Sequence, residues 1–316
     1  MVIKMDRVKE YEALVNIYEK EGLDTSLFGD RIAAIIISGE RIIGLNNVEG
    51  VEIVGEEIEN GVRAEIKIKD NIELPFPIHL CTGFLKSEGY QRVVFDIIVG
   101  KGSKVKFLSH CIFPYAKDFT HDAYAKIRID EGAFVVYEDE HVHGEGVRMI
   151  SKTEVKVGRK GRYMGKFSLI KHRAKELKLE MRVDLDDYAV TELVSKVKAI
   201  KDDSVEVKEV AYLTGAHSRA NLKTTVIAFD NAKANVINEA YGLGEHSKGH
   251  VECHEIVKGE ADVQTVPFLR VKNDKAELTH EASIGRINEA QLMQLMAKGL
   301  GEEEAAELII KGLLRE

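Results

Sequence analysis

The chain opens with a helical pattern of apolar residues. Residues 5–21 carry apolar side chains three and four positions apart, and Gly22 follows at the point where such a helix would end. The apolar positions of this stretch are Val8, Tyr11, Leu14, Val15 and Tyr18. The pattern predicts one amphipathic helix in an N-terminal helical segment, residues 1–35.

Short runs in which apolar and polar residues alternate dominate the middle of the chain. Residues 63–69, 125–129 and 180–185 are examples, and Val and Ile supply many of their apolar positions. Period-two alternation is typical of half-buried strands, so residues 36–286 are predicted to form a β core. Helical spacing returns over residues 287–316, where Asn288 is the expected N-cap and glycines near position 300 divide two helices.

Turn-forming or small residues precede strands at a nearly constant interval. They are Gly102, Gly132, Gly161, Asp203, Ala232 and Glu260, and the successive intervals are 30, 29, 42, 29 and 28. Such a period favours a solenoid, in which each coil buries its apolar face against the next coil. The interval of 42 indicates an inserted loop or a change of coil. An antiparallel sandwich is the alternative, although its turns recur roughly every 8–12 residues.

Composition narrows the class of protein. The 316 residues carry a formal net charge of −8, which argues against a nucleic-acid-binding surface. No apolar run is long enough to cross a membrane, and the first residues lack the apolar core of a signal peptide. Three cysteines without a Cys-x-x-Cys pair favour reduced thiols and therefore a cytoplasmic protein.

Metal-ligating residues gather near the end of the β core. Cys253 precedes the adjacent pair His280 and Glu281, and thiolate, imidazole and carboxylate together bind iron or zinc. Cys253 shares a strand face with Val251 and Glu255, although a single cysteine on a strand is commonly a small buried apolar residue. Adjacent residues of a regular strand point to opposite faces, so His280 and Glu281 reach one metal only through a bulge, a turn or a dimer interface.

Two further patterns offer metal or sulfur chemistry. Cys81, Cys111 and His141 are equally spaced at about the predicted coil length, so a constant coil register would stack them, either to pass sulfur by thiol exchange or to bind a metal. Ordinary buried cysteines are the other interpretation. His141 and His143 lie on one strand face and loosely resemble the His-x-His pair of cupin metal sites, with His172 as a distant ligand. A metal-dependent cupin-like β-barrel enzyme is therefore the alternative function.

The stretch His250-Val-Glu-Cys253-His-Glu, the segment Leu-Thr-His280-Glu281-Ala-Ser-Ile-Gly285 and the helical sequence up to Leu314 resemble the C-terminal core signature of the SufB/SufD family. These proteins are scaffolds of SUF iron-sulfur cluster assembly. The chain resembles a short, archaeal-type member, because it is shorter than a typical bacterial SufB and has no N-terminal cysteine cluster. The resemblance implies a right-handed parallel β-helix flanked by helical segments. It also implies a non-enzymatic scaffold that binds a transient iron-sulfur cluster through Cys253, His280 and Glu281.

The resemblance also implies partners. In the family a SufC-type ABC ATPase docks on the C-terminal helices, here within residues 287–316, and two subunits pair through the ends of their β-helices. The chain has no P-loop of its own, so ATP hydrolysis is expected in the partner. A sulfur donor protein is expected as well. The type of cluster stays open, as does the choice between a SufB-like role, which Cys253 and Glu281 fit, and a SufD-like role, which His280 fits.

Overall fold

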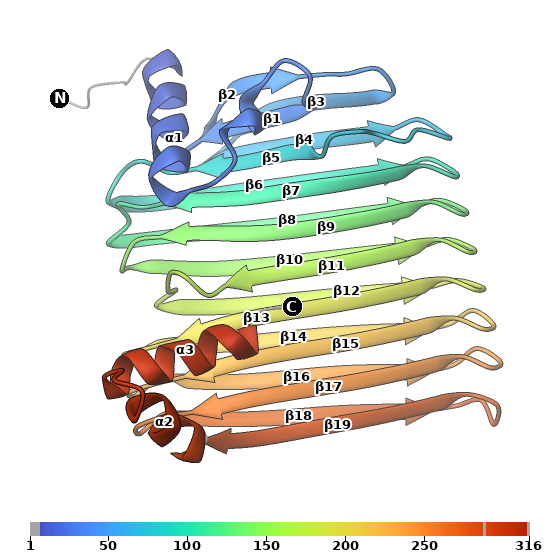
Figure 1. Cartoon of the computed structure of the whole chain (residues 1–316). Helices are drawn as coiled ribbons and strands as arrows, with labels where there is room; N and C mark the ends of the chain where they lie inside the picture. The colour runs from blue at the N-terminus through green and yellow to red at the C-terminus, as the bar shows by residue number, and fades with distance from the viewer. Residues whose placement is uncertain (1–6, 287–288, 315–316) are drawn as a thin grey trace.

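The computed structural model describes residues 7–286 and 289–314. Two large sheets lie face to face, and from β4 onward the chain passes from one sheet to the other with every strand (Figure 1). The strand order of the first sheet is β19-β17-β15-β13-β11-β9-β7-β5-β1-β2, and that of the second is β18-β16-β14-β12-β10-β8-β6-β4-β3. The molecule is a parallel β-solenoid with helices at both ends of the chain, which confirms the predicted fold class.

The bounds of the strands are as follows. The first sheet contains β1 (Ala34–Ser38), β2 (Arg41–Asn46), β5 (Ile78–Gly83), β7 (Lys104–Phe113), β9 (Phe134–His143), β11 (Arg162–Leu169), β13 (Val190–Ala199), β15 (Arg219–Ala228), β17 (Lys248–Val257) and β19 (Glu277–Arg286). The second contains β3 (Val51–Ile58), β4 (Gly61–Ile68), β6 (Glu88–Val99), β8 (Asp118–Ile129), β10 (Val147–Val157), β12 (Glu176–Leu185), β14 (Ser204–Leu213), β16 (Lys233–Gly242) and β18 (Asp262–Val271). Only β1–β2 and β3–β4 pair antiparallel among the described strands.

The core fills the narrow space between the two sheets. Alternate residues of each strand point inward and stack on the equivalent residue of the next coil, as Leu193, Leu222 and Val251 do on β13, β15 and β17. Each coil thus buries its apolar face on its neighbours, the source of stability in a solenoid. Lys201, Asp230 and Gly259 all have positive φ angles at equivalent turns of successive coils, because a sharp reversal is needed there.

The long interval between Gly161 and Asp203 does not come from an inserted loop. Gly161 precedes β11 of the first sheet, whereas Asp203 precedes β14 of the second sheet. The recurring turns up to residue 161 therefore lie on one edge of the solenoid, and those from residue 203 onward lie on the other edge. The interval spans about one and a half coils of constant length.

Helices cover the outer face of the first sheet near both of its ends. Helix α1 (Arg7–Glu21) and the 3₁₀ helix η1 (Thr25–Phe28) cover its beginning, where Leu14 and Tyr18 pack with Ile36 and Ile112. Helices α2 (Glu289–Met296) and α3 (Glu302–Leu314) lie near its end, and Ile310 of α3 packs on Ile227 (Figure 1).

The start of the predicted C-terminal segment, residues 287–288 with the expected cap Asn288, lies outside the described residues. Among the helices that the structure describes, none combines the length and the apolar character that a membrane span requires.

Candidate functional site

Cys253 points into the solenoid near its C-terminal end. It lies on β17, in register with Thr224 of β15 and Ala282 of β19, and its side chain is fully buried. Burial raises the pKa of the Cys253 thiol to about 11, and the charge of nearby Glu255 adds to the effect. The thiol is therefore protonated at neutral pH, and a metal must displace its proton to gain a thiolate ligand.

Glu255 lies two residues further along β17, on the same inner face. It is buried, and neither of its carboxylate oxygens makes a hydrogen bond of ordinary geometry within the described part of the chain, although the nearby Thr265 side chain partly offsets the effect of burial on its pKa. Burial raises the pKa of Glu255 to about 7. A buried carboxylate without a well-formed hydrogen bond is costly to maintain and often marks a functional position. Sequence parity had already placed Glu255 on the face of Cys253, but it gave the residue no role.

His280 and Glu281 lie on β19, the last strand of the first sheet, and both are exposed. Their register with Val251 and Glu252 is uninterrupted, so β19 has no bulge at this point. Val251 faces the core, so His280 lies on the Cys253 side of the sheet and Glu281 lies on the opposite side. Within one chain, the inner face of the first sheet thus carries Cys253, Glu255 and His280, whereas Glu281 lies on the outer face.

A buried polar network lies directly beneath Cys253. Thr224 and Ser195 continue the column of Cys253 on the two preceding strands of the first sheet. The carboxylate of Glu209, from the second sheet, accepts hydrogen bonds from Ser195 Oγ at 2.6 Å and from Thr224 Oγ1 at 3.1 Å. Asn238 donates to the same carboxylate at 3.1 Å. The sequence analysis missed this network, although Ser195, Thr224 and Cys253 are equally spaced along the chain.

The predicted stack of Cys81, Cys111 and His141 is wrong for Cys81. Cys111 is in register with His141, but its partner on β5 is Thr82, and Cys81 is in register with His110. The coil from β5 to β7 is therefore one residue shorter than the spacing of the two cysteines, and a shift of one residue moves a side chain to the opposite face. Cys81 faces outward and is buried beneath α1, so a sulfur relay from Cys81 to Cys111 is not supported.

The cupin-like alternative is not favoured. His141 and His143 do share the inner face of β9, with ring centroids 5.1 Å apart. However, His172, the expected distant ligand, lies 3.2 Å from Glu21 of α1. Glu145, the carboxylate that follows the two histidines in the sequence, forms ion pairs with Arg173 and Lys201. The strands form a parallel solenoid instead of an antiparallel barrel, so the cupin ligand set is not assembled.

Comparisons with known proteins give one matching family model and several similar chains. Residues 86–313 match the family model described as "SUF system FeS cluster assembly, SufBD core domain". An iron-sulfur cluster assembly SufBD family protein of Pyrococcus horikoshii is 75% identical over 316 residues, covering 100% of this chain and 97% of the relative. A protein of the same description from Methanocaldococcus jannaschii is 35% identical, with 99% of each chain covered. A further Pyrococcus horikoshii protein of that description is 28% identical over 78% of this chain and 56% of its own length.

Proposed function

The chain belongs to the SufBD family of iron-sulfur cluster assembly proteins, and from this premise we propose that it is a scaffold subunit. In this proposal it builds or holds a labile iron-sulfur cluster, the cargo of the system, and catalyses no reaction itself. The three free cysteines support a reducing, cytoplasmic setting.

The observation that carries the proposal is the inward-facing pair Cys253 and Glu255 near the open end of the solenoid. A thiolate is the strongest ligand for iron in this part of the chain. Carboxylate and imidazole ligands bind a cluster less firmly, so a set made from Cys253, Glu255 or Glu281, and His280 suits a cluster that must be handed on. Glu255 is thereby added to the ligands expected from the sequence.

A homodimer through the solenoid ends would complete this set. No further coil of the described chain covers the end of the core at the edge strands β18 and β19, so Val271 and Ile284, which point inward, are about half exposed. Exposed edge strands readily pair with another chain. Pairing two such ends brings the two copies of Cys253 and His280 toward one interface, and it allows Glu281 of one copy to approach the other.

An ABC-type ATPase of the SufC kind is the second proposed partner, and ATP hydrolysis takes place there. Helix α2 supports this assignment because Met293 and Met296 are exposed on it. Exposed apolar side chains that are close together commonly mark an interface. A sulfur donor protein is the third proposed partner, because a scaffold of the SUF system that catalyses no reaction itself must receive the sulfur of its cluster from another protein.

Anaerobic reconstitution with iron and sulfide tests the proposal. We expect Cys253→Ser to lose most of the cluster absorbance, because the oxygen of serine is a poor substitute for the thiolate. Cys81→Ser is the matched control, since its thiol is equally buried but lies beneath α1. Circular dichroism checks that both variants fold. Full cluster occupancy in Cys253→Ser would exclude Cys253 as a ligand.

A further inference from the structure

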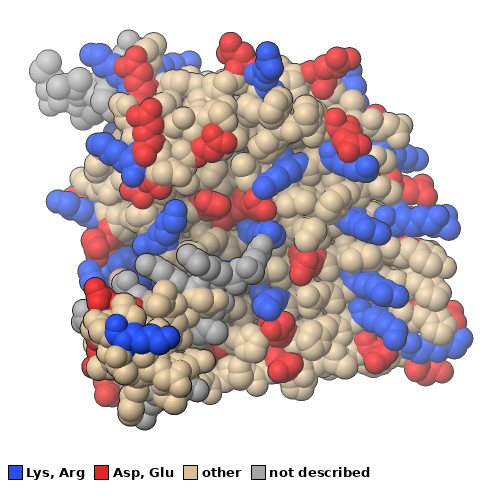
Figure 2. All heavy atoms as spheres, viewed as in Figure 1, with Lys and Arg blue, Asp and Glu red and all other residues tan. Residues whose placement is uncertain are grey.

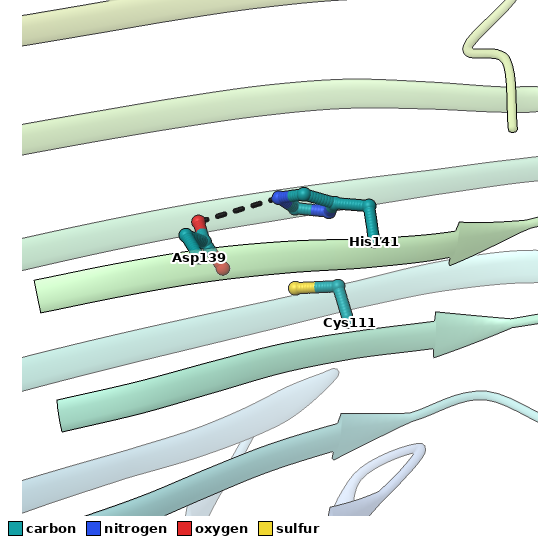
Figure 3. Close-up of side chains that lie close together, drawn as sticks. All are labelled: Cys111, Asp139 and His141. Atoms are coloured by element: carbon teal, nitrogen blue, oxygen red, sulfur yellow. Dashed lines mark ion pairs between the residues drawn. The ribbon is translucent and has the colours of Figure 1, made fainter. Parts of the chain in front are cut away.

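A second group of metal-ligating side chains lies in the N-terminal half of the solenoid. Cys111 of β7 and Asp139 and His141 of β9 each offer one ligand atom, and these atoms lie within 4.8 Å of one another. All three side chains point into the space between the sheets, with Asp139 and His141 turned toward each other above the sulfur of Cys111 (Figure 3). Three strands of the first sheet, β11, β13 and β15, separate this group from Cys253 on β17.

His121, on β8 of the second sheet, lies beside Cys111 and is the candidate for a fourth donor. Its Nε2 lies 3.7 Å from Cys111 Sγ, and Nε2 of His141 lies 3.4 Å from Oδ2 of Asp139. In a tetrahedral zinc site with ordinary bond lengths, sulfur and nitrogen ligands are about 3.6 Å apart, and nitrogen and oxygen ligands about 3.3 Å apart. The 3.4 Å separation between His141 and Asp139 is long for a charged hydrogen bond but fits one edge of such a tetrahedron.

Several potential ligand atoms of the group make no hydrogen bond within the described residues. Both ring nitrogens of His141 and Oδ1 of Asp139 are buried and accept or donate no hydrogen bond within the described residues. Buried polar atoms are nearly always hydrogen-bonded, so an imidazole whose two nitrogens make no hydrogen bond, with only Oδ2 of Asp139 at 3.4 Å from Nε2, needs an explanation. A metal ion bound between them satisfies His141 and Asp139 together.

Gln91 holds His121 in the form that binds a metal. The side-chain amide nitrogen of Gln91 donates to the carbonyl oxygens of Gly39 and Gly83, at 2.7 and 3.1 Å, so its carbonyl oxygen is the atom that faces His121. That oxygen lies 3.1 Å from Nδ1 of His121. Nδ1 must therefore carry the proton, and Nε2 presents its lone pair toward Cys111. Metal-binding histidines are commonly oriented by such a hydrogen bond from the other ring nitrogen.

The space beside the ligands admits one ion. A cavity of 30 Å³ is lined in part by Cys111, His121 and Asp139. That volume accommodates about one water-sized particle. The aromatic rings of Phe113 and Phe167 pack against His121 and His141, with centroids 4.8 and 4.7 Å apart, so apolar rings cover part of the two imidazoles.

We propose that Cys111, Asp139 and His141, with His121 as the fourth ligand, bind one divalent transition-metal ion of the Zn²⁺ or Fe²⁺ class. One thiolate, two imidazoles and one carboxylate are the donors that such ions prefer. Binding releases the thiol proton of Cys111 to solvent, because the thiolate is the ligand. The ion ties β7, β8 and β9 together, and a metal-bound Cys111 is not free for thiol exchange. This site is separate from the proposed cluster ligands.

Anaerobic titration of the reduced, metal-stripped full-length protein with Co²⁺ tests the site. We expect one Co²⁺ per chain, a thiolate-to-cobalt charge-transfer band and the visible bands of tetrahedral cobalt. Cys111→Ser should lose the charge-transfer band, and Asp139→Asn and His141→Ala should each weaken binding at least tenfold. Cys253→Ser and Cys81→Ser are the matched controls and should keep the band. That result would also distinguish this site from the proposed cluster ligands. If the cluster proposal failed, the cobalt spectrum would be unchanged.

The outcomes decide the proposal even if a variant unfolds. Wild-type protein that shows no thiolate band overturns it, as does a band that keeps its full intensity in Cys111→Ser. Cobalt bound without a thiolate band, for example at the exposed histidines His217 and His246, whose rings stack with centroids 5.0 Å apart, also overturns it. Thermal unfolding gives an independent measurement: Zn²⁺ should raise the Tm of wild type and Cys253→Ser but not that of Asp139→Asn.

Discussion

At the scale of single residues, the interior of this solenoid is unusual for the polar groups that it encloses. Glu209 is fully buried, and its carboxylate accepts three hydrogen bonds, from Ser195, Thr224 and Asn238. Burial nevertheless raises the pKa of Glu209 above its ordinary value of 4.5, because the lost hydration outweighs these hydrogen bonds. The fold therefore favours the protonated carboxyl more than the unfolded chain does.

This difference predicts a pH dependence of stability. The stability associated with protonated Glu209 is fully present below pH 4.5, and it is lost as the pH rises through the higher pKa of the folded state. Glu209→Gln keeps the shape but cannot ionise. We therefore expect the free energy of unfolding of Glu209→Gln, relative to wild type, to increase between pH 5 and pH 8, by about 1.4 kcal/mol for each unit of pKa difference. Guanidinium unfolding at both pH values measures this change, and a pH-independent difference would contradict it.

At the scale of elements, the two C-terminal helices have different surroundings. Helix α3 is fixed to the solenoid through Ala305, Ala306 and Ile310, which are buried, and Ile310 packs on the outer face of the first sheet. Helix α2 instead leaves Met293 and Met296 exposed. The apolar positions of this segment thus divide between capping the solenoid and a surface that is free in the single chain. Figure 2 shows the part of the surface that these helices form, at the lower left, as mostly tan with few charged side chains.

The exposed part of α2 predicts where the proposed ATPase partner binds. We expect the double substitution Met293→Asp and Met296→Asp to weaken binding of the ABC-type ATPase at least tenfold in calorimetry, because each charge loses hydration in an apolar interface. Val8→Asp on α1 is the matched control, since Val8 is 61% exposed and Met293 is 65% exposed. Unchanged affinity in the double variant, with an intact circular dichroism spectrum, would place the partner elsewhere.

At the scale of the whole molecule, the two ends of the solenoid differ. The antiparallel pairs β1–β2 and β3–β4 end the two sheets at the N-terminal side, and α1 covers the neighbouring face. At the other end β18 and β19 are edge strands, and Ile284, whose side chain points inward, is 50% exposed. A solenoid end that is not capped invites pairing with a second chain.

The open end predicts the contact surface of the proposed homodimer. We expect Ile284→Lys combined with Val271→Lys to convert dimer into monomer, because inward-pointing charges at an edge prevent strand pairing. Val54→Lys is the matched control, since Val54 is 56% exposed but lies on β3 at the other end. Light scattering after size-exclusion chromatography measures the mass. A dimer that persists in the double variant would show that the copies associate through another surface.

The sequence by itself determined the class of fold and which face of its strand each proposed cluster ligand occupies. Alternation with period two identified the strands, and the recurrence of turns at a nearly constant interval indicated a solenoid. Strand parity was enough to place Cys253 and Glu255 on one face, because both lie on the same strand. The same rule separated His280 from Glu281, and the unbroken strand β19 keeps them on opposite faces.

Only the tertiary structure decided which residues of different coils meet. The coil from β5 to β7 puts Thr82 beside Cys111, whereas the next coil, which is one residue longer, puts His141 there. Because successive side chains of a strand point in opposite directions, a change of one residue in coil length moves a side chain from the inner face of the sheet to its outer face. The number of residues in each turn determines the coil length, and the pattern of apolar residues does not reveal that number. The contact between His121 and Cys111 depends in addition on how the two sheets pack, which no spacing within the sequence contains.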